Sequence, residues 1–263
     1  MSATFSDLRA RVLSGVAMAA VGAGAVWAGG MVFAALAIGL AGLMGWELHR
    51  MMTPEARDGQ SEAHGVVAAI LVAVFSATLG GWLSLGGLAL SAAVIAWRQP
   101  RDRLAFGAYL GLILWAAHGL IALRDGFGPG FVLWLICVVV ASDVAGYFAG
   151  RILGGPRFWP RISPKKTWSG TVAGWLLAAV VGWVFMRQMG LGASVVVLSA
   201  VLAFAGQMGD IAESALKRHK GVKDSSDLIP GHGGVLDRFD AMIAVAALAY
   251  VMALFNVFAV AVS

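Results

Sequence analysis

Side chains that could bind a cation and phosphate groups are concentrated in residues 206–240, which read GQMGDIAESALKRHKGVKDSSDLIPGHGGVLDRFD. Two long apolar runs flank this stretch. Its charged members are Asp210, Glu213, Asp224, Asp227, Asp237 and Asp240, with Lys217, Arg218, Lys220, Lys223 and Arg238. The chain has only 14 acidic and 19 basic residues in all. This density predicts a site where a divalent cation and a nucleotide triphosphate meet.

The spacing of these residues adds to the prediction. If a helix continues through GDIAESALKR, the same face of that helix carries Asp210, Glu213, Ser214 and Lys217, which are spaced at i, i+3, i+4 and i+7. Asp237 and Asp240 share a face by the same rule. Crowded carboxylates repel one another unless a cation lies among them, and Mg²⁺ prefers oxygen ligands that it shares with substrate phosphates. The predicted metal ligands are Asp210, Glu213, Asp237 and Asp240. The sequence has no cluster of cysteines and histidines of the kind that would indicate a zinc site.

Two loops are candidates for binding phosphate. The segment 229–234, IPGHGG, is rich in glycine, and backbone N–H groups of such turns can contact phosphate oxygens. The segment 150–170, GRILGGPRFWPRISPKKTWSG, carries five basic residues. For these basic residues an alternative stays open, because membrane topology and attraction to anionic lipid also favour them.

Asp143 lies twelve residues into the apolar run 131–150, about 18 Å along a helix. A charge within the hydrocarbon costs ~2.5–3.5 kcal/mol on insertion scales, so such a residue is a functional candidate. A structural ion pair or a proton relay is the alternative interpretation. Three histidines elsewhere, His49, His64 and His118, lack metal-ligand spacing. Glu47 is expected only to cap a helix or to pair with a loop arginine.

The composition predicts an all-α, polytopic membrane helix bundle. Of 263 residues, 60% are hydrophobic and 13% are charged, against about 25% charged in soluble domains. We expect nine spans, at about 12–28, 31–48, 64–81, 83–97, 105–123, 130–150, 170–187, 191–210 and 241–262. A cleaved signal peptide is the alternative for the first of them. The net charge of +5 follows from loop arginines and lysines, so we expect no nucleic-acid partner.

The positions of lysine and arginine predict the orientation. With a cytoplasmic N-terminus, 17 of the 19 basic residues face the cytoplasm, and only Arg124 and Arg187 lie outside. The span directions then bring Asp143, the end of the eighth span and the start of the ninth to the cytoplasmic face. We therefore divide the chain into a scaffold half, residues 1–125, and a catalytic half, residues 126–263.

Residues 214–240, SALKRHKGVKDSSDLIPGHGGVLDRFD, resemble the signature of the phosphatidate cytidylyltransferase (CDP-diacylglycerol synthase) family. The matching positions are Ser214, Lys217, Arg218, Lys223, Asp224, Pro230, His232, Gly233, Gly234, Asp237, Arg238 and Asp240. Shorter resemblances include Ser142, Asp143, Tyr147, Gly150, Ile162, Ser163, Pro164, Lys166 and Thr167. The resemblance covers roughly residues 130–262. Ser169 and Ala241 depart from residues common in the family.

The resemblance implies that CTP and phosphatidate react to give CDP-diacylglycerol and pyrophosphate with Mg²⁺, and a second cation stays open. The implied catalytic residues are Asp143, Asp210, Asp237, Asp240 and Lys217. The implied substrate-binding residues are Ser163, Lys166, Thr167, Lys217, Arg218, Lys223, Asp224, His232, Gly233, Gly234 and Arg238. His232 is interpreted as a loop or phosphate contact rather than a base.

Three other functions are compatible with parts of the sequence. A proton- or cation-coupled transporter would use Asp143 and Asp210 as coupling groups, but it would not require the polar stretch 206–240. A lipid kinase, or a CTP-dependent enzyme with another lipid acceptor, would need the same kind of site and would differ only in the acceptor. A non-catalytic assembly factor would leave the carboxylates unexplained. We expect a bacterial plasma membrane protein in contact with the bilayer, and a homodimer stays open.

Overall fold

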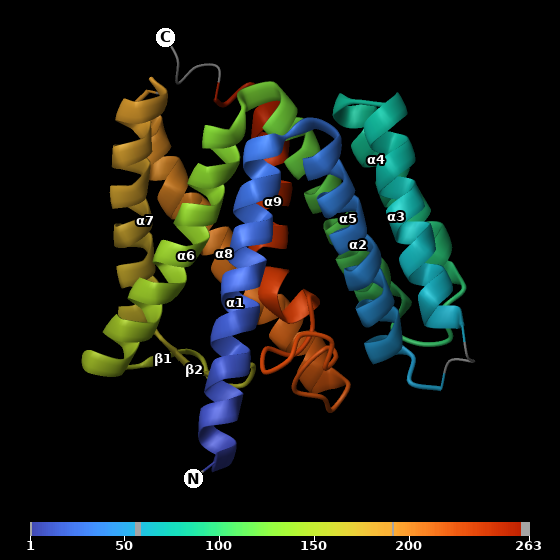
Figure 1. The fold of residues 1–263 in the computed structure, drawn as a ribbon, viewed down its shortest axis with the longest axis horizontal. Helices are drawn as coiled ribbons and strands as arrows, with labels where there is room; N and C mark the ends of the chain where they lie inside the picture. The colour runs from blue at the N-terminus through green and yellow to red at the C-terminus, as the bar shows by residue number, and fades with distance from the viewer. Residues whose placement is uncertain (1, 56–58, 191, 259–263) are drawn as a thin grey trace.

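The computed structural model describes residues 2–55, 59–190 and 192–258, with side chains from residue 12 onward. Nine helices form most of this part of the chain (Figure 1). They are α1 (Ser2–Ala28), α2 (Gly30–Met52), α3 (Gln60–Thr78), α4 (Gly81–Trp97), α5 (Arg103–Phe127), α6 (Pro129–Ile152), α7 (Trp168–Met189), α8 (Ser194–His219) and α9 (Leu236–Leu254). The predicted all-α helix bundle is confirmed.

Six of the described helices, α2, α3, α5, α6, α7 and α8, are long and apolar enough to cross a membrane. The apolar part of α1, Val12–Ala28, and helix α4 are shorter. Apolar side chains also cover much of the outer surface, as in Leu83 and Leu176, which suits contact with lipid rather than water. The chain is therefore a multi-pass membrane protein.

Several helix boundaries differ from the expected spans, and α1 already begins at Ser2 rather than near residue 12. Helix α8 does not end near residue 210 but continues to His219. The helix therefore continues through GDIAESALKR, as the predicted shared face of Asp210, Glu213, Ser214 and Lys217 requires. Helix α9 begins at Leu236 rather than 241 and ends at Leu254, and residues 259–263 lie outside the described part. The longer α8 and the earlier start of α9 are accounted for by Lys217, Glu213 and Asp237, whose charged side chains find partners inside the fold.

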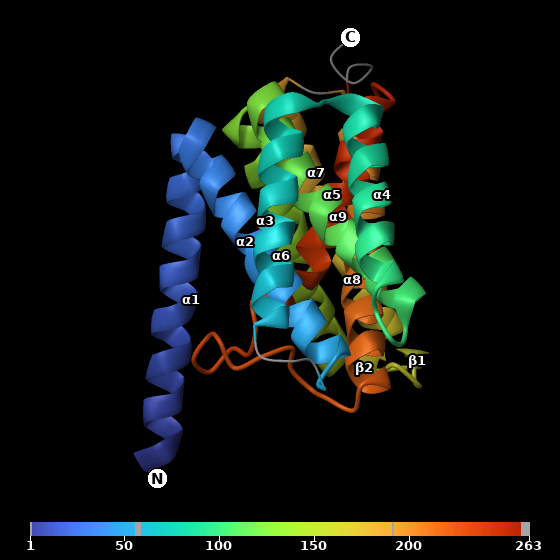
Figure 2. The same ribbon diagram turned by 90° about the vertical axis from the view of Figure 1, so that its right-hand side faces the viewer.

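The elements that carry the candidate site residues collect at one end of the bundle. The C-terminal ends of α6 and α8, the start of α9 and the N-terminal end of α1 lie together there, while the α1–α2 turn lies at the opposite end (Figure 1). Helix α1 runs along the outside of the bundle (Figure 2). The topology therefore brings distant parts of the chain to one polar end, as the span directions predicted.

Small residues allow the helices that carry the charged groups to pack closely. A Cβ on Gly209 would lie 2.5 Å from the backbone oxygen of Asp240, so α8 and α9 touch through their main chains beside the carboxylates. A Cβ on Gly170 would lie 2.5 Å from the Gly146 oxygen, where α6 meets α7. Because real Cβ atoms do not come this close, any larger side chain at either position would push two helices apart.

A short hairpin that the sequence analysis did not predict follows α6. Strands β1 (Arg157–Trp159) and β2 (Ser163–Thr167) pair in antiparallel register, with the first residue of β1 opposite the last of β2. Two prolines, Pro160 and Pro164, interrupt the alternating pattern by which short strands are recognised. The hairpin places Lys166 next to α8.

Candidate active site

Helix α8 presents its charged residues on one face, as the spacing predicted. Ser214 Oγ donates to Asp210 Oδ1 at 3.3 Å, and Lys217 Nζ lies 2.6 Å from Glu213 Oε2. The same ammonium reaches α9, where it lies 2.6 Å from Asp237 Oδ1. Lys217 is largely buried between these two buried carboxylates, so it ties α8 to α9. Its position explains why a lysine is held in an otherwise apolar helix interface.

Lys166 brings a second ammonium to the cluster from the hairpin. Its Nζ lies 2.5 Å from Asp210 Oδ2 and donates to the backbone oxygen of Gln207 at 3.3 Å. Asp143 of α6 lies within electrostatic range of both Lys166 and Asp210, and Asp240 lies within range of Asp143 and Asp210. The structure therefore gathers the predicted carboxylates from α6, α8 and α9 around two lysines.

Asp237 organises the loop that precedes α9. Its Oδ2 accepts hydrogen bonds from the N–H of Ser225 at 2.9 Å, from Ser225 Oγ at 3.0 Å and from the N–H of Gly234 at 2.8 Å. Burial opposes ionisation, but the Lys217 ammonium and these N–H groups hold the pKa of Asp237 below its usual value. Asp237 is thus a charged anchor at neutral pH, and the Gly234 N–H is already paired with it rather than offered to phosphate.

Glu47 of α2 has a larger role than the sequence indicated. Its fully buried carboxylate accepts from the N–H groups of Val235 at 2.9 Å and Leu236 at 2.6 Å, and from Ser226 Oγ at 2.5 Å. These N–H groups belong to the start of α9, where a negative charge is favourable. The sequence left a helix cap or a pair with a loop arginine open for Glu47, and the structure places its carboxylate against the start of α9 and the preceding loop.

Tyr109 of α5 is a second residue that the sequence reasoning missed. Its side chain is 5% exposed, and within the described residues its hydroxyl has no hydrogen-bond partner. It lies within electrostatic range of Glu213, Asp240 and Asp210. Because buried polar groups are normally paired, this hydroxyl is a candidate contact for a ligand group beside the carboxylates. A lone tyrosine in an apolar helix carries no sequence signal that would reveal this.

The remaining predicted residues lie around this centre. His232 contacts α1 through Ser14 Oγ, 2.8 Å from its Nδ1. Gly233 has a φ of +83°, which favours glycine in this turn. Thr167 caps α7 by accepting from the Gly170 N–H, so a structural role accounts for its hydroxyl. The side chains that are exposed near the loop are Arg218, Lys223, Asp224 and Arg238, and Ser163 is half-buried at the start of β2.

The far end of α8 is fixed by a residue outside the predicted set. Asp102, before α5, lies 2.6 Å from Lys220 Nζ and 3.1 Å from His219 Nε2. The hydrogen bonds from Lys220 and then His219 lower the pKa of Asp102 below its usual value. This contact holds the last turn of α8, and hence Lys217, against the first half of the chain.

The donor set fits a hard divalent cation. Asp143, Asp210, Glu213 and Asp240 offer only oxygen atoms, and the buried Glu213 Oε1 has no hydrogen-bond partner within the described residues. In the described part of the chain no three Asp, Glu, His or Cys side chains are arranged to hold a metal ion as they stand. Lys166 lies against Asp210, and Lys217 lies against Glu213. A cation would therefore bind with a shift of lysine contacts.

Comparison with known proteins assigns the family. The model of the cytidylyltransferase family matches residues 9–256. The chain belongs to this family. A phosphatidate cytidylyltransferase of Brucella suis is 35% identical over 257 residues, which is 93% of each chain. Those of Bacillus subtilis and Helicobacter pylori are 38% and 41% identical over 154 and 156 residues, which cover 56–58% of each chain. Membership in the cytidylyltransferase family makes the chain an enzyme, and the predicted resemblance is confirmed.

Proposed function

We propose that this enzyme transfers a cytidylyl group from CTP to phosphatidate, with release of pyrophosphate, at the cytoplasmic face of a bacterial plasma membrane. The observation that carries the proposal is the cluster of carboxylates and lysines at one end of a membrane bundle. Relatives over nearly the whole chain are named phosphatidate cytidylyltransferase, which supports the choice of substrates. The N-terminal end of α1 lies at the same end of the bundle, and the positive-inside count supports a cytoplasmic site.

In the proposed reaction, a phosphate oxygen of phosphatidate forms a bond to the α-phosphorus of CTP, and the bond to the pyrophosphate oxygen breaks. Both reactants are anions, so the site must reduce their repulsion and align them. Lys166 is the more accessible of the two lysines in the cluster, with a quarter of its side chain exposed, and we assign it to a phosphate group of a substrate. The attacking oxygen is already ionised, so no strong base is required.

Mg²⁺ bound by the carboxylates would supply positive charge to the triphosphate. Asp210 and Asp240 are the proposed ligands that face the cluster, with Glu213 and Asp143 beside them. Asp237 is a less suitable ligand than the sequence suggested, because its side chain is buried and is held by the N–H groups of Ser225 and Gly234 as well as by Lys217, whereas a third of the Asp210 side chain is exposed. We therefore assign Asp237 and Lys217 to positioning α8, α9 and the loop.

Purified protein in detergent tests the proposal directly. With CTP, phosphatidate and Mg²⁺, a CDP-lipid and pyrophosphate should form in equal amounts, and chelation of divalent cations should stop the reaction. Turnover of diacylglycerol with a nucleotide would instead indicate a lipid kinase. Solute flux into sealed vesicles without nucleotide, combined with no CDP-lipid, would refute the proposal in favour of a transporter.

A further inference from the structure

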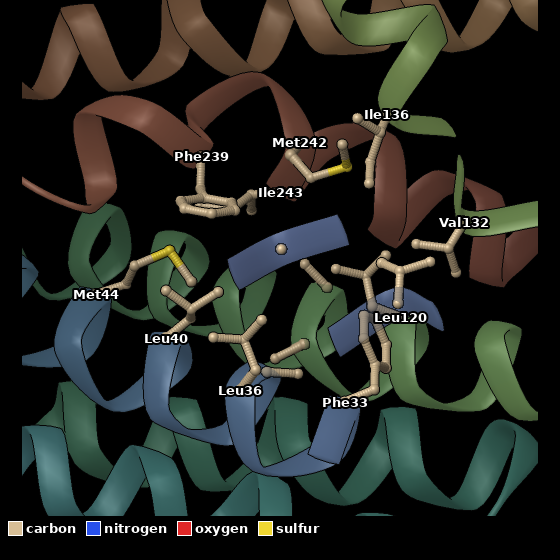
Figure 3. A pocket seen from close by; sticks show the side chains of 15 residues that line it. Phe33, Leu36, Leu40, Met44, Leu120, Val132, Ile136, Phe239, Met242 and Ile243 are labelled. Atoms are coloured by element: carbon tan, nitrogen blue, oxygen red, sulfur yellow. The ribbon is translucent and has the colours of Figure 1, made fainter. Parts of the chain in front are cut away.

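A partly open apolar cavity of about 100 Å³ lies between α1, α2, α5, α6 and α9. Every residue that lines it is apolar, and side chains of α2 and α9 point into it from opposite sides (Figure 3). Apolar cavities stay free of water and accept apolar ligands: one of about 150 Å³ holds a benzene molecule. The lining therefore selects a hydrocarbon group.

One end of the cavity adjoins the candidate active site. Met44 lines the cavity on α2, and Glu47, three residues further along the same helix, holds the loop before α9. Phe239 lines it on α9, directly before Asp240. A ligand with its apolar part in this cavity would thus have its polar end beside the charged cluster. That arrangement describes an amphiphile.

The length of the cavity corresponds to one leaflet. Its lining on α2 extends from Phe33 to Met44, and eleven residues of helix span about 16 Å. Half of the hydrocarbon core of a bilayer is about 15 Å thick. The lining of the cavity therefore runs from the level of the site to about the middle of the membrane, which is the depth to which one acyl chain of a lipid reaches.

We propose that this cavity binds an acyl chain of the lipid substrate, and that α1 forms the wall over it. This inference rests on the proposed function. Gly22 and Val26 of α1 line the cavity, and Ser14 of the same helix contacts the loop, with its Oγ donating to the Pro230 oxygen at 3.3 Å. Helix α1 runs outside the other helices (Figure 2), so it separates the bound chain from the surrounding lipid.

Two glycines of α1 provide a matched test. Gly22 lines the cavity and Gly24 does not, and at both positions an added Cβ would have no atom within 4 Å. Gly22→Phe should fill part of the cavity, while Gly24→Phe adds the same ring to an exposed position. We expect Gly22→Phe to raise KM for long-chain phosphatidate about tenfold, which corresponds to ~1.4 kcal/mol, and to leave KM for a water-soluble short-chain phosphatidate unchanged. Gly24→Phe should match the wild type with both lipids.

Labelling of the unmodified protein gives a result that does not depend on turnover or on the variants' folding. A phosphatidate with a photoreactive group in its acyl chain should label the cavity residues, such as Leu36 and Leu120, more than exposed residues of the outer surface. Labels confined to the outer surface would overturn the proposal, as would equal chain-length profiles for the two glycine variants. Failure of the wild type to form any CDP-lipid would instead reject the proposed function, and the labelling pattern would still decide whether the cavity holds an acyl chain.

Discussion

Removing the Glu47 carboxylate should loosen the loop and the start of α9. Glu47→Ala leaves the buried N–H groups of Val235 and Leu236 without an acceptor, together with the Ser226 hydroxyl. An unsatisfied buried donor costs about 1–3 kcal/mol, so the two N–H groups alone predict a loss of about 2–6 kcal/mol of local stability. Glu47→Gln should also destabilise the loop, because its amide nitrogen would face one of these donors.

The control is a carboxylate that is paired at the surface. Glu55 lies 3.6 Å from Arg101, and both side chains are mostly exposed. Such pairs contribute about 0–1 kcal/mol, so Glu55→Ala should behave like the wild type. The comparison separates loss of a buried acceptor from loss of a negative charge as such.

Hydrogen exchange by the amides of Val235 and Leu236, measured in detergent, is the direct assay. In Glu47→Ala we expect exchange at least about tenfold faster than in Glu55→Ala, since every 1.4 kcal/mol of lost local stability is a factor of ten. The CTP-dependent activity should fall with it, because Asp237 and Asp240 begin the same helix. Equal exchange rates in the two variants would refute the role of Glu47.

Three further substitutions test individual contacts. Asp237→Asn removes a charged acceptor from Lys217 and from the loop, and should lower kcat at least about a hundredfold while leaving the protein inserted and folded by gel filtration. Lys166→Ala should raise KM for CTP or phosphatidate about tenfold, and the exposed Lys165→Ala on the same strand should not; equal kinetics would remove Lys166 from the site. Tyr109→Phe should lower kcat several-fold with little change in thermal stability, whereas Tyr109→Phe with full activity would show that its hydroxyl contacts no ligand.

The charged face of α8 could be predicted because it follows from local geometry. Asp210 with Ser214, and Glu213 with Lys217, are four residues apart, and such pairs meet on any helix. The meeting of α6, α8 and α9 could be predicted from the direction of successive spans. Both features follow from the helix repeat and from the alternation of successive spans between the two sides of the membrane.

The partners that join distant elements could not be predicted in this way. Glu47 and Leu236 are 189 residues apart, and nothing in the sequence around Glu47 distinguishes it from an ordinary surface carboxylate at a helix end. Tyr109 lies in an apolar helix whose face toward the site is set by packing. Asp237 was expected to bind a cation, but it contacts Lys217 and the loop. These contacts also depend on the final positions of two helices.

The division at residue 125 therefore describes the location of the charges better than it describes a separable unit. Asp143, Asp210 and Asp240 are fixed on long helices of the second half, whereas the loop before α9 is held by Glu47 and the end of α8 by Asp102, both from the first half. A fragment that begins at residue 126 would keep the carboxylates but lose these acceptors and the α2 wall of the apolar cavity. Because catalysis of a reaction between two anions depends on charges held in place before the substrates arrive, we expect such a fragment to be inactive even where it inserts into a membrane.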